Sequence, residues 1–252
     1  MTGTASVVCG IGAHLPERVR TSAETASPLG VTEDWIVQRT GVHRRRVVSL
    51  GESTADMAVP AAARALASSG GSVQAVILAT TTPDHRVPAT APTVASRLGL
   101  GTVPAWDLGA GCTGFLYGLA VATGLIHAGI AERVLVIGAD AMTTLVDPRD
   151  RVSAPIFGDG AGAMVLRAGD PEEPGALGPF DLGSDGANAE LLIVRAGGSR
   201  RPGTAGADDP RDHFMAMRGR PLFRHAVHRM TTSSRAALDR RGWRTHVFPP
   251  DR

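Results

Sequence analysis

The sequence contains no lysine, because all 26 of its basic residues are arginines, and its formal net charge is only +2. A nucleic-acid-binding surface normally needs a marked, clustered excess of positive charge. The charge balance therefore gives no support for a nucleic-acid partner. The basic run Arg44–Arg46 is short and is more typical of a solvated face. We attribute the lack of lysine, together with abundant alanine and glycine, to the codon bias of a GC-rich genome.

Cysteine is almost as scarce, since only Cys9 and Cys112 occur in 252 residues. Two cysteines form neither a disulfide framework nor a structural zinc site, so we expect no metal. The chain enters an apolar strand pattern without a basic leader or cleavage signal, which predicts a cytoplasmic protein. Its longest apolar helix pattern, 113–129, is too short and too rich in glycine and alanine to predict a membrane span.

Apolar runs alternate with helical patterns along the chain, which has room for one large domain or two small ones. This alternation predicts an α/β protein with a parallel or mixed sheet. The predicted strands of the first part are Ala5–Gly12, Val73–Thr80, Val103–Leu108, Arg133–Gly138 and Ala163–Leu166. In the second part, Leu177–Leu182 and Leu191–Val194 are candidates for a β pair. An amphipathic helix is predicted over Arg220–Arg241. Its side chains expected to face the core are Leu222, Phe223, Ala226, Val227, Met230, Ala237 and Leu238.

The stretch Trp106–Asp140 reads as a strand end, a small-residue turn, a long apolar helix and a second strand. Cys112 lies in the turn, where backbone N–H groups at the helix start favour a thiolate, the nucleophilic form. The alternative is that Cys112 is a small buried apolar residue, and the residues of this stretch leave the two interpretations open. The helix, Thr113–Gly129, is apolar on almost every side, so we expect it to be buried on all sides.

Eight motifs, in order from end to end, make the chain resemble β-ketoacyl-acyl-carrier-protein synthase III, a family of thiolase-like condensing enzymes. They are Trp35–Arg45, Thr80–Pro88, Asp107–Leu119, Arg133–Asp140, Asp150-Arg151, Phe157–Leu166, Gly183–Gly186 and Met217–Phe223. The resemblance implies an α/β, thiolase-like fold of layered helices and mixed sheets. It also implies that an acyl-coenzyme A loads the enzyme and that the acyl group then condenses with malonyl-acyl carrier protein, in fatty acid or polyketide biosynthesis.

The resemblance assigns roles by position. Cys112 matches the nucleophile that accepts the acyl group. Trp35 and Arg151 match the pair that sandwiches the adenine of coenzyme A, while Arg39 and Thr40 match contacts to its nucleotide end. Coenzyme A enters as part of a substrate, so no cofactor is implied. The alternative interpretations are local: Trp35 is a helix anchor and Arg39 a surface charge.

Phe157 and Phe223 match apolar walls of the channel for the pantetheine arm and the acyl group, and their alternative role is plain core packing. The implied partners are acyl-coenzyme A, acyl carrier protein and a second copy of the chain. The dimer contact would involve the segment around Val87 and the strand that follows the helix of Cys112.

The sequence departs from the family pattern near its end. Family members use a His and an Asn of the second half on the extender thioester; Pro250 stands where the His is expected, and Asn188 is the only asparagine. We therefore expect a complete N-terminal half over 1–169 and a truncated or frameshifted C-terminal half over 170–252. Condensation is then in doubt. The alternatives are a related acyltransferase that forms an ester or amide, and an inactive fragment or non-catalytic subunit.

Overall fold

A five-stranded sheet forms the centre of the first of two compact units, Met1–Leu177 and Gly178–Arg252, into which the chain divides. The computed structural model describes residues 5–203 and 209–242. In spatial order the strands are β1 (Ala5–His14), β7 (Gly160–Gly169), β6 (Arg133–Asp140), β4 (Ala75–Ala79) and β5 (Ala105–Leu108). β4 pairs in parallel with β5 and β6, whereas β7 is antiparallel to β1 and β6. The predicted mixed sheet is confirmed, while the predicted halves 1–169 and 170–252 stay a prediction.

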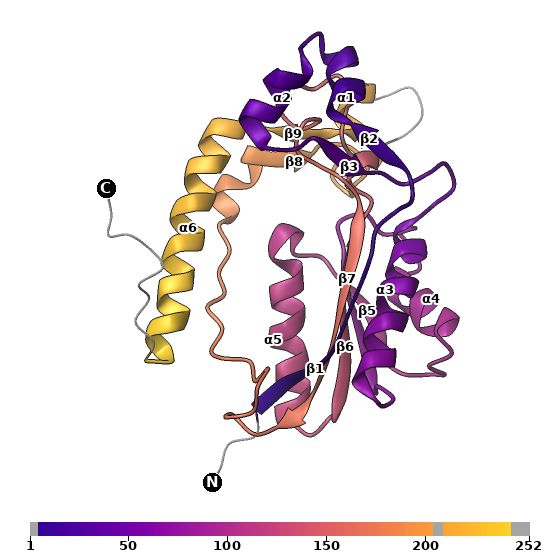
Figure 1. Cartoon of the computed structure of the whole chain (residues 1–252), viewed down its shortest axis with the longest axis vertical. Helices are drawn as coiled ribbons and strands as arrows, with labels where there is room; N and C mark the ends of the chain where they lie inside the picture. The colour runs from indigo at the N-terminus through magenta and orange to yellow at the C-terminus, as the bar shows by residue number, and fades with distance from the viewer. Residues whose placement is uncertain (1–4, 204–208, 243–252) are drawn as a thin grey trace. The chain divides into compact units, whose positions relative to one another are not determined.

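Helices cover both faces of this sheet, α3 (Thr54–Ser69) and α4 (Thr90–Arg97) on one side and α5 (Gly114–His127) on the other (Figure 1). The remaining elements of the unit are short: β2 (Val19–Thr21), α1 (Ser22–Leu29), α2 (Glu33–Thr40), β3 (Arg44–Arg46), η1 (Gly111–Thr113) and η2 (Met142–Thr144). Two covered faces explain why β4 is apolar at every position rather than at alternate ones.

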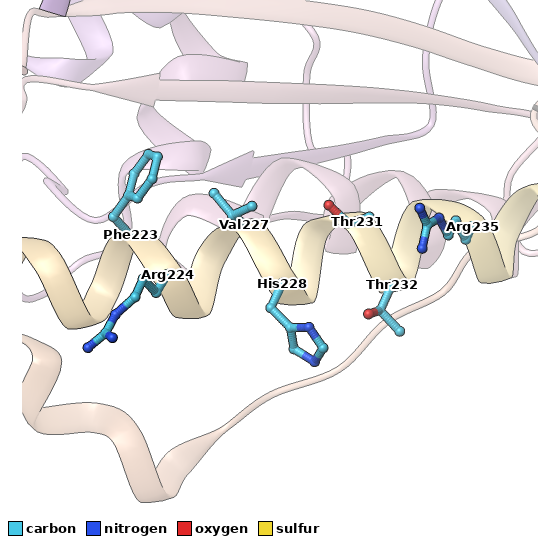
Figure 2. A pocket seen from close by; sticks show the side chains of 7 residues that line it. All are labelled: Phe223, Arg224, Val227, His228, Thr231, Thr232 and Arg235. Atoms are coloured by element: carbon cyan, nitrogen blue, oxygen red, sulfur yellow. The ribbon is translucent and has the colours of Figure 1, made fainter. Parts of the chain in front are cut away.

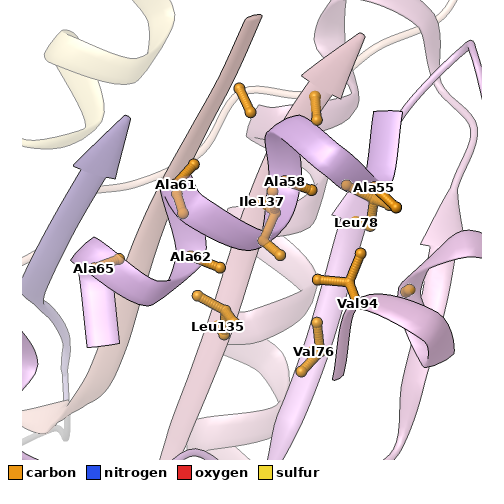
Figure 3. Close-up of a cluster of buried hydrophobic side chains, with 14 of the residues drawn as sticks. Ala55, Ala58, Ala61, Ala62, Ala65, Val76, Leu78, Val94, Leu135 and Ile137 are labelled. Carbon is orange, nitrogen blue, oxygen red and sulfur yellow. The ribbon is translucent and has the colours of Figure 1, made fainter. Parts of the chain in front are cut away.

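The hydrophobic core lies between the sheet and α3. Val76 and Leu78 of β4 point into it together with Leu135 and Ile137 of β6, against a row of α3 alanines (Figure 3). Side chains alternate across a strand, so Ile77 points to the opposite face, toward α5. All five residues of β4 are buried in consequence.

Glycines in β1 allow α3 to approach the sheet unusually closely. A Cβ added at Gly12 would lie less than 3.0 Å from the Ala61 carbonyl oxygen and 2.5 Å from the Ala65 nitrogen. Both of these atoms belong to the helix backbone, so a side-chain rotation cannot relieve the clash. Glycine is therefore required at this crossing for steric reasons rather than for its backbone freedom.

The expectation that the Cys112 helix is buried on all sides is wrong for the described chain. One face of α5 packs on the sheet, where a Cβ at Gly118 would lie 2.9 Å from Val136 Cγ1. The other face carries apolar side chains that are exposed, with Leu116 at 53% and Val121 at 39%. The apolar composition therefore reflects two potential contact faces, of which the sheet covers one.

The second unit pairs its strands differently from the sequence-based expectation. β8 (Leu192–Val194) pairs antiparallel with β9 (Met215–Met217), not with Leu177–Leu182. The short helices η3 (Gly186–Leu191) and η4 (Pro210–His213) precede β8 and β9, and α6 (Gly219–Arg240) follows β9. The prediction that α6 turns an apolar side to a core is confirmed only in part. Leu222, Ala226, Ala237 and Leu238 are half-buried, whereas Phe223, Val227 and Met230 are exposed, and none of the described side chains of α6 is fully buried. Pro250 lies outside the described residues.

Two features are absent from the described residues. None of their helices combines the length and the apolar character that crossing a bilayer requires. No group of three or more histidine, cysteine or acidic side chains among them is arranged to hold a metal ion.

The β1–α3 crossing yields a stability test. We expect Gly12→Ala to lower the free energy of unfolding by about 1–3 kcal/mol or more, the usual cost of forcing extra atoms into a packed core. Gly162→Ala, on the neighbouring strand β7, is the control, since an added Cβ there meets nothing within 4 Å. Thermal unfolding of both variants measures the difference. Equal melting temperatures would contradict the steric explanation.

Candidate active site

Cys112 lies in η1, between the end of β5 and the first residue of α5. Its thiol is free and exposed, which argues against the alternative that it is a buried core residue. Gly111 has a backbone φ of +54°, which residues with a side chain rarely adopt. The Thr113 hydroxyl donates to the Ala110 carbonyl at 2.9 Å and so closes the turn. The turn therefore presents the thiol at a helix start, where the positive end of the helix dipole can stabilise developing negative charge.

The first turn of α5 sits on the carboxyl ends of two parallel strands. A Cβ added at Gly114 would lie 3.2 Å from the Ala79 Cβ of β4, and one added at Gly138 of β6 would lie 3.1 Å from Phe115 Cδ2. The position of the Cys112 turn thus depends on how the ends of β4 and β6 are held.

Carboxylates of the quoted motifs hold the neighbouring loops, a role that the sequence analysis missed. Asp107, the third residue of β5, accepts from the backbone N–H groups of Thr90 at 2.8 Å and Ala91 at 2.7 Å, at the start of α4. Asp84 accepts from the Ala55 N–H at 3.0 Å, at the start of α3. The sequence signal that could have revealed this role is Asp107 itself, an acidic residue at the end of a predicted strand just before the turn of Cys112.

Trp35 lies in the first turn of α2, where the Thr32 side chain caps the helix by accepting from the Trp35 N–H at 3.1 Å. The Arg39 guanidinium carbon lies 4.2 Å from the centroid of the indole ring, and Arg39 Nη1 donates to the Trp35 carbonyl at 3.2 Å. A cation over an indole face is a favourable contact. The sequence analysis did not predict this stacked pair, although the i, i+4 spacing in a helix places the two side chains together.

Arg151 is held at the turn between α1 and α2. Its Nε donates to the Leu29 carbonyl at 2.8 Å and its Nη2 to the Gly30 carbonyl at 3.3 Å. The structure therefore brings Arg151 to the turn that leads into the helix of Trp35 and Arg39. Thr40 ends that helix, and its hydroxyl is engaged locally, donating to the Ile36 carbonyl at 2.8 Å. Contacts of these four residues with coenzyme A stay a prediction.

The two predicted channel residues belong to different units. Phe157 is half-buried in the first unit, two residues before Asp159. The buried Asp159 carboxylate accepts from the N–H groups of Val48 and Thr143, both at 2.8 Å, and so fixes this loop. Phe223 of α6 is 70% exposed. It belongs to a pocket of about 520 Å³ (Figure 2), whose other lining residues are Arg224, Val227, His228, Thr231, Thr232 and Arg235. A shared channel stays a prediction.

The mixed sheet and the cysteine at the start of its packed helix define a thiolase-like α/β protein. A family model described as 3-oxoacyl-[acyl-carrier-protein (ACP)] synthase III matches residues 106–186. Beta-ketoacyl-[acyl-carrier-protein] synthase III 3 of Streptomyces coelicolor is 53% identical over 243 residues, which cover 95% of this chain and 72% of that protein.

Solved structures agree with the sequence matches. The crystal structure of 3-oxoacyl-(acyl carrier protein) synthase III from Pseudomonas aeruginosa PAO1 superposes with a TM-score of 0.86 at 46% identity, covering 95% of this chain and 72% of that chain. The priming β-ketosynthase from the R1128 polyketide biosynthetic pathway gives a TM-score of 0.85 at 31% identity, with coverages of 95% and 71%. The chain therefore belongs to the β-ketoacyl-acyl-carrier-protein synthase III family.

The coverage also bears on the expectation of a largely missing C-terminal half. The chain spans 72% of the length of the Streptomyces coelicolor relative and 74% of the Pseudomonas aeruginosa one. The match thus continues well past the midpoint of these relatives. The comparisons do not support the expectation that the C-terminal half is largely missing.

The location of Arg151 yields a binding test. If Arg151 stacks on the adenine, Arg151→Ala removes a cation–aromatic contact worth about 1–2 kcal/mol, and coenzyme A should bind roughly tenfold more weakly. Arg149→Ala is the matched control, because Arg149 is exposed and pairs only locally with Asp147 at 3.3 Å. Calorimetric titration with coenzyme A gives both affinities. An equal loss in the two variants would remove Arg151 from the predicted coenzyme site.

Proposed function

We propose that this chain transfers the acyl group of an acyl-coenzyme A to Cys112, as the first step of a β-ketoacyl-acyl-carrier-protein synthase III reaction. The observation that carries the proposal is the exposed, unpaired thiol at the start of α5 in a chain of this family. A thiol in this position meets the main geometric need of a covalent acyl carrier, which is access for the thioester carbonyl.

The loading step balances as a thioester exchange. The Cys112 thiolate attacks the acyl carbonyl, an S–C bond forms, and the bond between the carbonyl and the coenzyme sulfur breaks. The coenzyme leaves as a thiolate and takes up a proton. Negative charge develops on the carbonyl oxygen during attack, and N–H groups near a helix start are suited to stabilise it.

Trp35, Arg39, Thr40 and Arg151 would bind the nucleotide end of the coenzyme. Their placement around the α1–α2 turn and along α2 supports this assignment, because it gathers an indole and two guanidinium groups on adjoining segments. Phe157 and Phe223 would line the path of the pantetheine arm and the acyl group. Coenzyme A acts here as part of the substrate rather than as a cofactor.

Acyl carrier protein and a second copy of the chain are the further partners that we propose. The strand after the helix of Cys112, β6, pairs with β4 on one side and β7 on the other, so it has no open edge for the contact that the sequence analysis expected of it. Among the described strands, β5 pairs only with β4 and so ends the sheet. The side chain of Val87, which precedes α4, is 85% exposed. An open sheet edge and an exposed apolar side chain both support a contact between two copies. A cytoplasmic location is part of the same proposal.

Condensation would follow loading: the malonyl group on the carrier protein loses carbon dioxide, and its carbanion attacks the acyl thioester and releases the Cys112 thiolate. The names of the relatives favour this reaction over ester or amide formation. The enolate that develops needs hydrogen-bond donors.

Labelled acetyl-coenzyme A tests the loading step. Intact-protein and peptide mass spectrometry should find one acetyl group on Cys112 of the wild-type chain. Cys112→Ala should show no adduct, and Cys9→Ala, which removes the half-buried cysteine of β1, should be labelled like the wild type.

A wild-type chain that stays unlabelled, or an adduct that persists in Cys112→Ala, would overturn the proposal. Addition of malonyl-acyl carrier protein to the loaded chain tests the second step. Failure to release a β-ketoacyl product from the loaded chain would contradict the proposed condensation.

A further inference from the structure

Three consecutive threonines after β4 converge on one carboxylate at the end of β6. Asp140 Oδ1 accepts hydrogen bonds from the Thr81 N–H at 2.7 Å and the Thr81 hydroxyl at 2.8 Å. The hydroxyls of Thr80 and Thr82 donate to the same oxygen, each at 3.2 Å. In the described chain, every hydrogen bond that the structure gives to this carboxylate ends on Oδ1.

This threonine–aspartate cluster ties together the three loops at the carboxyl edge of the parallel strands. The four bonds to Asp140 join the loop after β4 to the end of β6. The Thr82 hydroxyl oxygen also accepts from the Ala141 N–H at 2.8 Å, which fixes the loop after β6. On the other side, the Thr80 N–H donates to the Leu108 carbonyl at 3.4 Å, at the end of β5 and just before the Cys112 turn.

The cluster lies directly beyond the two residues on which α5 rests. Ala79, against which Gly114 packs, precedes Thr80, and Gly138, against which Phe115 packs, is two residues before Asp140. A change in the distance between the ends of β4 and β6 would move the residues on which the first turn of α5 packs. Cys112 is two residues before that turn begins.

We propose that Asp140 is a positioning residue for Cys112: it locks the ends of β4 and β6 together and thereby fixes the start of α5 and the direction of the thiol. The consequence for catalysis rests on the proposed acyl loading. The effect on the thiol itself does not, because it follows from the geometry of the strand ends.

The convergence on Oδ1 makes the proposal specific. Asparagine keeps one acceptor oxygen, so Asp140→Asn preserves the geometry of the cluster although it loses the charge. Asp140→Ala leaves the three threonine hydroxyls and the Thr81 N–H without their shared acceptor. The alanine variant should therefore impair Cys112 and the asparagine variant should largely restore it.

Alkylation of Cys112 by iodoacetamide, in a Cys9→Ala background and without coenzyme A, reports the thiol directly. Loading from acetyl-coenzyme A is measured in parallel. We expect Asp140→Ala to lower the loading rate constant roughly 10–100-fold, the usual effect of misplacing a reacting group by about 1 Å in a bound complex. Alkylation, which depends on the access and the thiolate character of Cys112, should slow measurably. Asp140→Asn should stay within about threefold of the parent for the same reason.

Asp56→Ala is the matched control. Asp56 also accepts from a backbone N–H and a hydroxyl, both of Ser53, at 2.8 and 2.9 Å, but it lies at the start of α3, the helix on the other face of the sheet from α5. We expect it to lower the melting temperature without changing the alkylation rate. If Asp140→Ala does not fold, Thr81→Val, which removes one hydroxyl donor from an exposed residue, should still slow alkylation measurably.

Alkylation at the parental rate in Asp140→Ala or, where that variant does not fold, in Thr81→Val would overturn the proposal. So would an asparagine variant as slow as the alanine variant, or an equal loss in Asp56→Ala. A parent chain that is alkylated but never acetylated would refute the proposed loading instead, and the alkylation rates of the variants would still decide the role of Asp140.

Discussion

The close contact of α3 and α5 with the two faces of one sheet is the constraint on which the first unit depends. Gly12 admits the backbone of α3, and Gly118 admits α5 against Val136. With both faces covered, the interior strand β4 has no room for a polar side chain, and all of its residues are buried. Polar and reactive groups are therefore confined to the ends of the strands, where the chain leaves the core.

At the strand ends, backbone N–H groups no longer find carbonyl acceptors in the sheet or the helices, and side-chain carboxylates accept their hydrogen bonds instead. Asp107 and Asp84 satisfy N–H groups at the starts of α4 and α3, and Asp159 satisfies two more in the loops beside Phe157. Each bond joins segments that are far apart in the sequence. The loops around Cys112 are thus defined by hydrogen bonds to acidic side chains, whose loss would leave buried or half-buried donors unpaired.

The strands of the first unit and the turn of Cys112 could be predicted from the sequence, because a doubly covered strand is uniformly apolar and a helix start after glycines is locally encoded. Composition alone does not predict the exposure of Leu116 and Val121, since it shows that a face is apolar but not what packs on it. The pairing of β8 with β9 depends on a contact between distant segments. The stacking of Arg39 on Trp35 could have been predicted, because residues four positions apart in a helix lie on the same face.

The residues predicted for the nucleophile and for the nucleotide end of the coenzyme lie in one unit, and a residue predicted for the acyl channel lies in the other. Cys112 and the four residues assigned to the nucleotide end of the coenzyme belong to the first unit, whereas Phe223 belongs to α6 of the second. α6 is 22 residues long, and none of its described side chains is buried, so its packing on the rest of its unit contributes little apolar burial. Thiol capture of an acyl group therefore draws mainly on groups held by a well-packed sheet.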